Sequence, residues 1–492
     1  MSRVRVSAPT WLLLSGLAAI VYAVAGRPGP FGGLVVVGAA LMHMGAGRST
    51  SRLEAGLATA VAAAGPASVA VAPIAPLAPL ATIPLTVLVA ASFALAGIVA
   101  GPSRAPARRF EAAGVRLGHA ARVTAGWCAV EAVWARPALL GDAALPVLAI
   151  GSALTDGPLL VVAGWLGVGG LSLLALTVGG IVAVGPFAPV LVVAAATVGL
   201  AYGVGPEGTR RAASPTEGSE AVRLRLVQHA PTPVSIARVR FDPGAAEEQL
   251  RFLEEHAGHA EGRLVLLPEA VLPRPLRMGG DPATLAVRPA GLPGATDVLF
   301  GTATVRAEGT FNSALLWSDA KLRIVADKRR LVPLTEAALT RGEARTATSW
   351  RGLRIAAAIC WEAAFPSVAR RAAREGATFL ALLANDAYAG TGPIGRLHLR
   401  MARLRAAESG LPIAFVQATG PSAAIAADGR IVAMLDAGRR GSIDVDLPIA
   451  GVRTPFRRTG DLVGPFSLAA SLASLALGGR ARRPAGSKGG EA

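Results

Sequence analysis

The chain has 492 residues, of which 52% are hydrophobic and only 16% are charged, and its mean hydropathy is +0.49. These values exclude an ordinary soluble protein and favour a polytopic membrane protein. The formal net charge of +17 does not indicate nucleic-acid binding, because the arginines are spread between apolar runs without interleaved aromatic residues. The charge instead predicts anionic lipid headgroups as partners.

Seven apolar stretches precede the first polar region, and most are near the roughly 20 residues that a helix needs to cross a bilayer. They fall at about 10–26, 31–47, 53–75, 80–101, 123–140, 157–183 and 186–205. A cleaved signal peptide would account for the first stretch only. Four prolines between 66 and 79 leave the count open by about one span. Residues 1–207 are therefore predicted to form a membrane domain of about seven transmembrane helices.

The arginines predict the orientation of these spans. Arg3 and Arg5 precede the first span, Arg48 and Arg52 follow the second, and five arginines between 104 and 122 follow the fourth. Because positively charged loops face the cytoplasm, the N-terminus is predicted to be cytoplasmic. An odd number of spans then delivers the following domain to the extracytoplasmic side, which is the periplasm if the cell has an outer membrane.

The composition of residues 221–450 is that of a globular α/β domain. Strand-like runs fall at 222–228, 264–267, 298–305, 314–317, 355–359, 379–383, 413–417 and 423–426, and helical patterns at about 245–257, 367–375 and 393–409. This alternation predicts sheets covered by helices. In the last helix, Leu397, Met401 and Leu404 share one face, and the arginines at 396, 400, 403 and 405 are expected to lie mostly on a solvated face.

A last apolar run at about 462–478 is followed by several basic residues. It predicts a C-terminal transmembrane helix over 460–480 and a basic cytoplasmic tail over 481–492. The run is short, and a buried helix is the alternative. The two cysteines, Cys128 and Cys360, exclude a disulfide framework and a cysteine-rich metal site.

Three segments of the α/β domain each end an apolar strand with one reactive side chain, namely Glu269, Lys328 and Cys360. Strand ends are where α/β folds present catalytic groups. A thiol needs a base to become a nucleophilic thiolate, which Glu269 can supply. Lys328 and the backbone N–H after Cys360 can stabilise a tetrahedral oxyanion. Taken singly, each residue also fits a plain structural role, as a core cysteine, a helix N-terminal charge or a solvated basic turn.

In this chain order the three residues resemble the Glu–Lys–Cys triad of the carbon–nitrogen hydrolase (nitrilase) superfamily. The resemblance covers roughly 221–450 and includes Leu267-Pro268-Glu269, Phe311-Asn312-Ser313, Cys360-Trp361-Glu362, Asn385-Asp386 and residues 398–408. It implies an α/β nitrilase-like fold, an α-β-β-α sandwich, beside the polytopic α-helical membrane domain.

The combination of this domain with about seven preceding spans resembles the apolipoprotein N-acyltransferase family. The lysine loop over 328–336 is similar to that of the family, with Glu336 matching an additional essential acid. Thr454-Pro455-Phe456 with Gly460-Asp461, and Gly126-Trp127 with Glu131, also resemble family segments. Glu131 is equally consistent with a residue near the membrane interface.

The resemblance implies transfer of an acyl chain from a phospholipid, through a thioester on Cys360, to the amine of a diacylglyceryl-cysteine lipoprotein. Glu336 and Glu362 would orient the lysine and the glutamate, and Trp361 is a further supporting residue. The protein is expected to be a monomer in a bacterial cytoplasmic (inner) membrane, crossing it several times, with no nucleic acid, metal or organic cofactor.

Three departures from the family pattern leave the acyl acceptor open: His229-Ala230 after the first strand, Trp361 where tyrosine is common, and Ala389 in the loop after Asn385-Asp386. A membrane-tethered amidase or another acyltransferase of the superfamily is one alternative function. A non-catalytic paralogue is the other, although burying three polar groups without a use for them would be costly.

Overall fold

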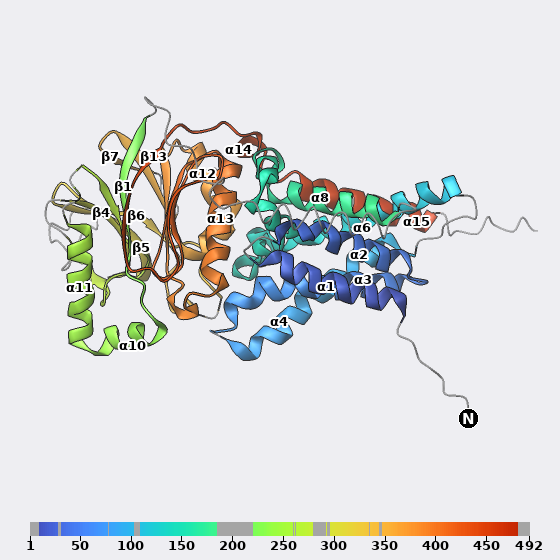
Figure 1. The fold of residues 1–492 in the computed structure, drawn as a ribbon, viewed down its shortest axis with the longest axis horizontal. Helices are drawn as coiled ribbons and strands as arrows, with labels where there is room; N and C mark the ends of the chain where they lie inside the picture. The colour runs from blue at the N-terminus through green and yellow to red at the C-terminus, as the bar shows by residue number, and fades with distance from the viewer. Residues whose placement is uncertain are drawn as a thin grey trace, which may run out of the picture.

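The computed structural model describes residues 9–27, 31–76, 78–102, 109–184, 220–258, 260, 262–278, 292, 296–333, 335–343 and 347–480. An α/β domain lies at one end of the molecule and a bundle of apolar helices at the other (Figure 1). The helix α13 (Pro393–Ser409) stands between them. The predicted span at 186–205 and the predicted tail at 481–492 lie outside the described residues.

The apolar helices follow the predicted stretches closely. They are α1 (Thr10–Gly26), α2 (Val35–Gly47), α3 (Arg52–Val71), α4 (Pro79–Ser92), α5 (Ala94–Ala100), α6 (Arg109–Trp134), α7 (Pro137–Leu140), α8 (Ala163–Val184) and α15 (Val463–Arg480). Among the described residues, the helical segments Arg52–Val71, Pro79–Ala100 and Pro158–Val184 are long and apolar enough to cross a membrane. Thr10–Gly26, Gly32–Gly47 and Val463–Leu477 are shorter apolar helices.

Two of these helices add detail to the predicted spans. The fifth stretch was expected at about 123–140, but α6 begins at Arg109, within the arginine-rich segment, and ends at Trp134. The helix therefore includes Arg116 and Arg122. Arginine is a good helix former, so these residues do not interrupt the helix. The C-terminal run forms α15, which packs against α6 and leaves Phe466 and Leu472 exposed. Exposed apolar side chains of this kind suit contact with lipid.

The α/β domain contains two sheets. Their strands are β1 (Ala221–Gln228), β2 (Leu264–Leu266), β3 (Leu276–Arg277), β4 (Asp297–Arg306), β5 (Gly309–Ser318), β6 (Lys321–Asp327), β7 (Thr348–Trp350), β8 (Leu353–Ile359), β9 (Phe379–Ala384), β10 (Ile413–Gln417), β11 (Ser422–Ile425), β12 (Ile431–Leu435) and β13 (Gly441–Pro448). One sheet has the order β13-β1-β2-β4-β5-β6, with β3 on β4, and the other has the order β12-β11-β10-β9-β8-β7.

The two sheets pack face to face between helices. β1 contacts β10, and β5 and β6 contact β8, so their apolar faces form the core. The helix α11 (Pro243–Ala257) contacts β1 on the outer side of the first sheet, while α12 (Pro366–Arg374) and α13 cover the second sheet. Two short helices, α10 (Pro233–Phe241) and α14 (Pro455–Thr459), complete the domain and its link to α15. The predicted α-β-β-α nitrilase fold is confirmed.

The prediction of a solvated arginine face on α13 is wrong. Arg400, Arg403 and Arg405 are all buried, because the outer face of α13 packs against the membrane helices instead of facing water. Arg400 and Arg403 form ion pairs of 2.8 and 2.6 Å with Asp156 of the helical bundle. Arg400 also donates hydrogen bonds to the carbonyls of Gly26 and Arg27 at the end of α1. These contacts fix the α/β domain on the bundle.

Replacing Asp156 by asparagine should therefore destabilise the protein. Two guanidinium groups would remain buried beside a neutral amide, and breaking a buried ion pair in this way costs about 3 kcal/mol. The measurement is the free energy of unfolding in detergent. The matched control is Asp428→Asn, which breaks the exposed pair between Asp428 and Arg430 and should cost less than about 1 kcal/mol. Equal losses in the two variants would contradict a clamping role for Asp156.

Candidate active site

Cys360 lies where β8 ends and a short 3₁₀ turn, Cys360–Ala364, begins. Its backbone has a φ of 49°, in the left-handed region that non-glycine residues seldom adopt. Such local strain is often found at functional sites, where the surrounding structure holds it. The thiol is buried, with 6% of the residue exposed.

Glu269 and Lys328 come from the facing sheet. Glu269 follows β2 after Leu267-Pro268, and Lys328 follows β6. Since β2 and β4 are parallel and the pairs β4–β5 and β5–β6 are antiparallel, β2 and β6 run in the same direction and present their carboxyl ends at one edge. The structure thus brings the two predicted residues together: Lys328 Nζ lies 3.1 Å from Glu269 Oε1, and both side chains are buried.

A glycine allows the turn at Glu269 to lie directly on β4. A Cβ at Gly301 would stand 2.6 Å from the Cα of Glu269, closer than any side chain permits. The backbone of Gly301 instead bonds on both sides of Glu269, to the carbonyl of Pro268 and the N–H of Val271. The carboxylate is therefore held by the sheet itself.

Glu336 contacts the lysine as predicted, and Asn312 joins it. Lys328 Nζ donates to Glu336 Oε1 at 2.8 Å, and Glu336 Oε2 accepts the N–H of Val332 at 2.7 Å. Asn312 Nδ2 donates to Glu269 Oε1 at 2.7 Å and to Glu336 Oε1 at 3.4 Å. An ammonium and an amide thus bridge two carboxylates. The sequence pattern includes Asn312 in the Phe311-Asn312-Ser313 segment but does not indicate this role.

The other two residues predicted to support the site are Glu362 and Trp361. Glu362 accepts the backbone N–H groups of Ile359 and Arg329, at 2.9 and 3.0 Å, so it braces the main chain beside Cys360 and Lys328. Its hydrogen bonds to the described residues do not include one to Glu269. Trp361 is buried and packs edge-on against Phe365, with ring centroids 5.9 Å apart. Its contacts are those of a packing residue behind the thiol.

The charges of the site act on the thiol and the amine in opposite ways. Burial raises the pKa of Cys360 well above its usual value, the negative charge of Glu269 raises it further, and Lys328 lowers it. Burial lowers the pKa of Lys328, but Glu269, Cys360 and Glu336 raise it more, so its net pKa is raised. At neutral pH the thiol is therefore protonated and the amine is an ammonium ion, and Cys360, Lys328 and Glu269 can act as nucleophile, oxyanion stabiliser and base.

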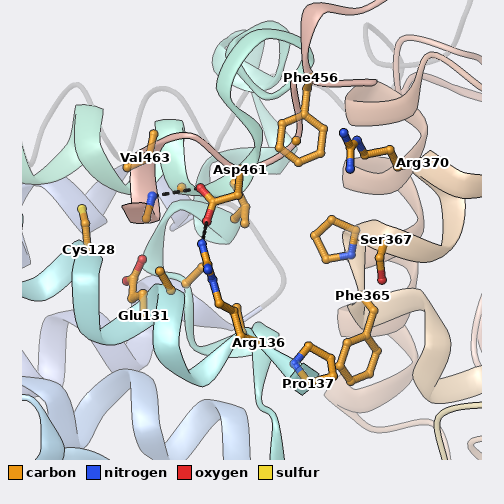
Figure 2. A pocket seen from close by; sticks show the side chains of 18 of the residues that line it. Cys128, Glu131, Arg136, Pro137, Phe365, Ser367, Arg370, Phe456, Asp461 and Val463 are labelled. Carbon is orange, nitrogen blue, oxygen red and sulfur yellow. Dashed lines mark hydrogen bonds and ion pairs between the residues drawn. The ribbon is translucent and has the colours of Figure 1, made fainter. Parts of the chain in front are cut away.

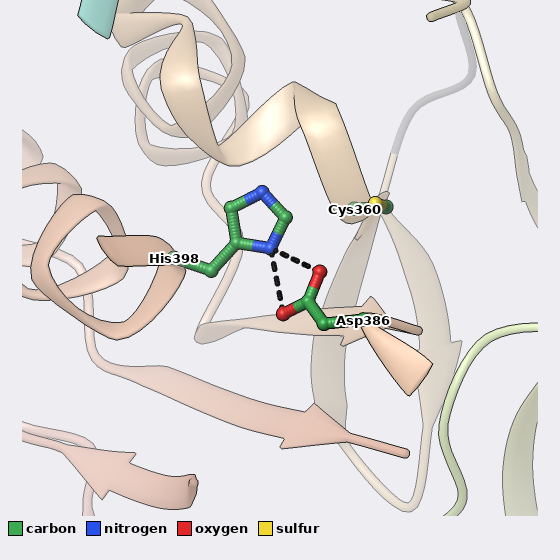
Figure 3. A group of neighbouring side chains, drawn as sticks. All are labelled: Cys360, Asp386 and His398. Atoms are coloured by element: carbon green, nitrogen blue, oxygen red, sulfur yellow. Dashed lines mark hydrogen bonds and ion pairs between the residues drawn. The ribbon is translucent and has the colours of Figure 1, made fainter. Parts of the chain in front are cut away.

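An aspartate–histidine pair lies beside the thiol (Figure 3). Asp386 follows β9, and its carboxylate oxygens lie 2.9 and 3.0 Å from Nδ1 of His398 on α13. One ligand atom from each of Cys360, Asp386 and His398 lies within 4.8 Å of the others, so these three buried residues are a possible donor set for a metal ion. In the structure the imidazole and the carboxylate bond to each other. In the sequence, the only sign of this pair is Asp386 at the end of a strand and a histidine twelve positions later.

The Asp386–His398 pair predicts a pH-dependent stability difference. Burial lowers the pKa of His398, but the charge and hydrogen bond of Asp386 outweigh it and raise the pKa above 6.5. The protonated pair therefore contributes its full stability below pH 6.5 and loses it as the pH rises through the folded-state pKa. The gap in unfolding midpoint between wild type and His398→Gln should be largest near pH 6 and shrink by pH 9.

The matched control for this prediction is His256→Gln, because the His256 ring contacts the carbonyl of Phe252 and not a carboxylate. Its effect on the midpoint should change little over the same range. A gap for His398→Gln that stays constant with pH would show that the pair is not charged in the folded protein.

Comparisons with known proteins agree with this architecture. Residues 298–454 match the carbon–nitrogen hydrolase family. The apolipoprotein N-acyltransferase of Bordetella bronchiseptica is 31% identical over 421 residues, covering 74% of this chain and 74% of that protein. That of Shewanella oneidensis is 25% identical over 370 residues, covering 68% and 69%. Among solved structures, a Nesterenkonia amidase from the nitrilase superfamily is 20% identical and covers 52% of this chain and 100% of its own, with a TM-score of 0.37.

The match to the Bordetella protein covers 74% of this chain, which is more than the α/β domain over 221–450 makes up, so this match assigns the family of the chain. The chain is a membrane protein with a carbon–nitrogen hydrolase domain, and it belongs to the apolipoprotein N-acyltransferase family.

Proposed function

We propose that the protein transfers an acyl chain from a phospholipid to the N-terminal amine of a diacylglyceryl-cysteine lipoprotein, through a thioester on Cys360. One observation carries the proposal: the Lys328 ammonium is held between Glu269 and Glu336 beside a buried thiol, in a chain whose other half is apolar helix. Family membership supports lipoprotein N-acylation, and the geometry supports thiol chemistry.

In the first half-reaction Glu269 takes the proton of Cys360, and the thiolate attacks the ester carbonyl of the phospholipid. The negative charge that develops on the carbonyl oxygen is stabilised by Lys328 and by the backbone N–H that follows Cys360. The C–O bond then breaks, and the leaving alkoxide takes the proton back from Glu269. The products are the Cys360 thioester and a lysophospholipid.

In the second half-reaction the amine of the lipoprotein attacks the thioester carbonyl. Glu269 accepts a proton from the attacking nitrogen, the C–S bond breaks, and Cys360 regains a proton. An amide and free enzyme result. The burial of Glu269, Lys328 and Cys360 supports transfer over hydrolysis, because bulk water has little access to these groups.

The same proposal includes the setting of the site. Residues 1–207 and 460–480 cross a bacterial cytoplasmic membrane, and residues 221–450 work on its extracytoplasmic face, where the arginine pattern of the loops directs them. A monomer suffices, because all three triad residues come from one chain. The acyl donor then reaches the site from the outer leaflet.

Mass spectrometry of the membrane-embedded protein tests the mechanism. After incubation with phospholipid, an acyl adduct should be found on Cys360, and addition of a diacylglyceryl-cysteine peptide should remove the adduct and yield N-acyl peptide. An adduct that is lost to water at the same rate with and without the peptide would identify a hydrolase instead. Absence of any adduct on folded protein would overturn the thioester mechanism.

A further inference from the structure

A pocket of about 370 Å³ lies where the helical bundle meets the α/β domain, away from the residues of the proposed triad (Figure 2). The C-terminal half of α6, the start of α8 and the start of α15 form one side of it, and Phe365 and Arg370 at α12 form the other. Its walls combine apolar side chains with four charged ones, Glu131, Arg136, Arg370 and Asp461. Both signs of charge are therefore present in one small space.

The charged groups at the mouth of the pocket are partly exposed, and Asp461 Oδ1 also accepts the backbone N–H of Gly464 at the start of α15. Arg136 and Asp461 face each other at 3.9 Å, longer than a hydrogen bond, and about two fifths of each side chain is exposed. Arg370 is held at the opposite wall by hydrogen bonds from its Nε and Nη2 to the carbonyls of Arg457 and Arg458. Glu131 also lines the pocket, but it is buried and its Oε1 accepts the indole N–H of Trp127 and the backbone N–H of Ile150. A ligand that carries a cation and an anion a few bonds apart would meet partners of opposite charge here.

A second hollow of about 500 Å³ continues along the same three helices. It is lined mainly by apolar and small side chains, among them Leu117, Ala121, Leu173, Ile181, Phe466 and Ala470. On α15 the charged pocket ends at Gly464 and the apolar hollow begins at Phe466, so the two hollows follow each other along one seam between α6, α8 and α15. On α6 the offset between Cys128 and Ala121 is seven residues, or about 10 Å along the helix.

We infer that the α6–α8–α15 seam binds one phospholipid with a zwitterionic, primary-amine headgroup. The ammonium lies at Asp461, and the phosphodiester lies between Arg136 and Arg370. One acyl chain occupies the apolar hollow beside Ala121. The order of the two hollows, charged at the domain boundary and apolar along the helices, is the order of headgroup and chain in a bilayer.

This lipid is distinct from the acyl donor bound at the thiol. Neither Cys360 nor Glu269 nor Lys328 lines the pocket or the hollow. The site does touch the catalytic region, because Phe365 lines the pocket and packs on Trp361, the residue after the thiol. An occupied seam would therefore support the turn that carries Cys360.

Native mass spectrometry of the Cys360→Ala protein tests the inference, because this variant cannot consume a donor and its result is independent of turnover. In nanodiscs of phosphatidylethanolamine, one lipid per chain should survive detergent extraction in addition to any donor held at the thiol site, and the seam variants identify it. Retention should fall about tenfold in Asp461→Asn, which removes a charge contact, and in Ala121→Phe, which fills the hollow. The matched controls Asp428→Asn and Ala469→Phe change exposed residues that line neither hollow and should retain the lipid.

Three results would overturn the inference. One is equal retention in all five proteins, which is expected of lipid bound around the helices without a site. Another is equal retention of phosphatidylglycerol, which lacks the amine. The third is full displacement by soluble glycerophosphoethanolamine at the same concentration, which would mean that only a headgroup binds. If one seam variant fails to fold, the other decides, since they act on different hollows.

Discussion

The Cys360→Ala protein is expected to lose acyl transfer by at least about 10⁴-fold, because removal of a covalent nucleophile leaves only binding and electrostatic effects. It should also form no acyl adduct with phospholipid. Its thermal midpoint should stay close to that of the wild type, since Ala and Cys have the same left-handed backbone cost at a φ of 49° and the lost sulfur is one atom of a buried side chain.

The measurement is the initial rate of N-acyl peptide formation together with the intact mass of the protein. Cys128→Ala provides the matched thiol control, because Cys128 is the only other cysteine of the chain and is buried in α6. Its adduct mass should match that of the wild type. An adduct that persists in Cys360→Ala and disappears in Cys128→Ala would contradict the assignment of the nucleophile.

Much of the α/β fold is legible in the sequence, because its signal is local. The alternation of apolar strands with amphipathic helices predicts β1, β8, β9 and β10, and the 393–409 helix has the predicted bounds. The three strand-end residues are equally visible. Their meeting is not local: Glu269 and Lys328 share one sheet, and Cys360 comes from the other. In the sequence, only the chain order Glu, Lys, Cys suggested that these three side chains lie together in the fold.

The arginines of α13 show what local patterns cannot predict. Helical periodicity separates an apolar face from an arginine-rich face, and the usual meaning of a charged face is contact with water. Here that face is covered by a second domain that supplies Asp156, more than 240 positions earlier in the chain. A single sequence does not pair such residues, so the burial of Arg400 and Arg403 required the structure.

The contacts of the residues around the triad depend on the structure for a related reason. Glu362 was expected to orient a side chain, but it accepts backbone N–H groups of Ile359 and Arg329, and such bonds leave no residue-type signal at the donor. Asp386 and His398 pair across a strand end and a helix. Their residue types are visible in the sequence, whereas the orientation that makes them partners depends on how α13 packs on the sheet.

Replacing Lys328 by methionine is expected to have the second large effect, on activity and on stability together. Its ammonium bonds Glu269 Oε1 at 3.1 Å and Glu336 Oε1 at 2.8 Å, and its side chain is 1% exposed. Removing it leaves buried carboxylates without their cation, which costs about 3–5 kcal/mol. Loss of the charge that faces the tetrahedral oxyanion should lower the transfer rate by about 10³-fold.

The stability loss should be the same from pH 6 to pH 9. The pKa of Lys328 is raised above its ordinary 10.5 by Glu269, Cys360 and Glu336 despite its burial. Stabilisation by a cation with a raised folded-state pKa is fully present below the unfolded-state pKa and is lost only as the pH rises through the folded-state value. Both values lie above this range, so the wild-type contribution is complete throughout it.

A second substitution separates the two effects of Lys328. In Lys328→Met/Glu336→Gln one carboxylate has become neutral, so unfolding free energy should recover by about 1–3 kcal/mol relative to the single variant, while the transfer rate stays low. The matched control is Lys321→Met, at the exposed start of the same strand β6, which should change stability by less than about 0.5 kcal/mol. Recovery of rate along with stability would mean that Lys328 only holds the carboxylates in place and does not face the reacting oxygen.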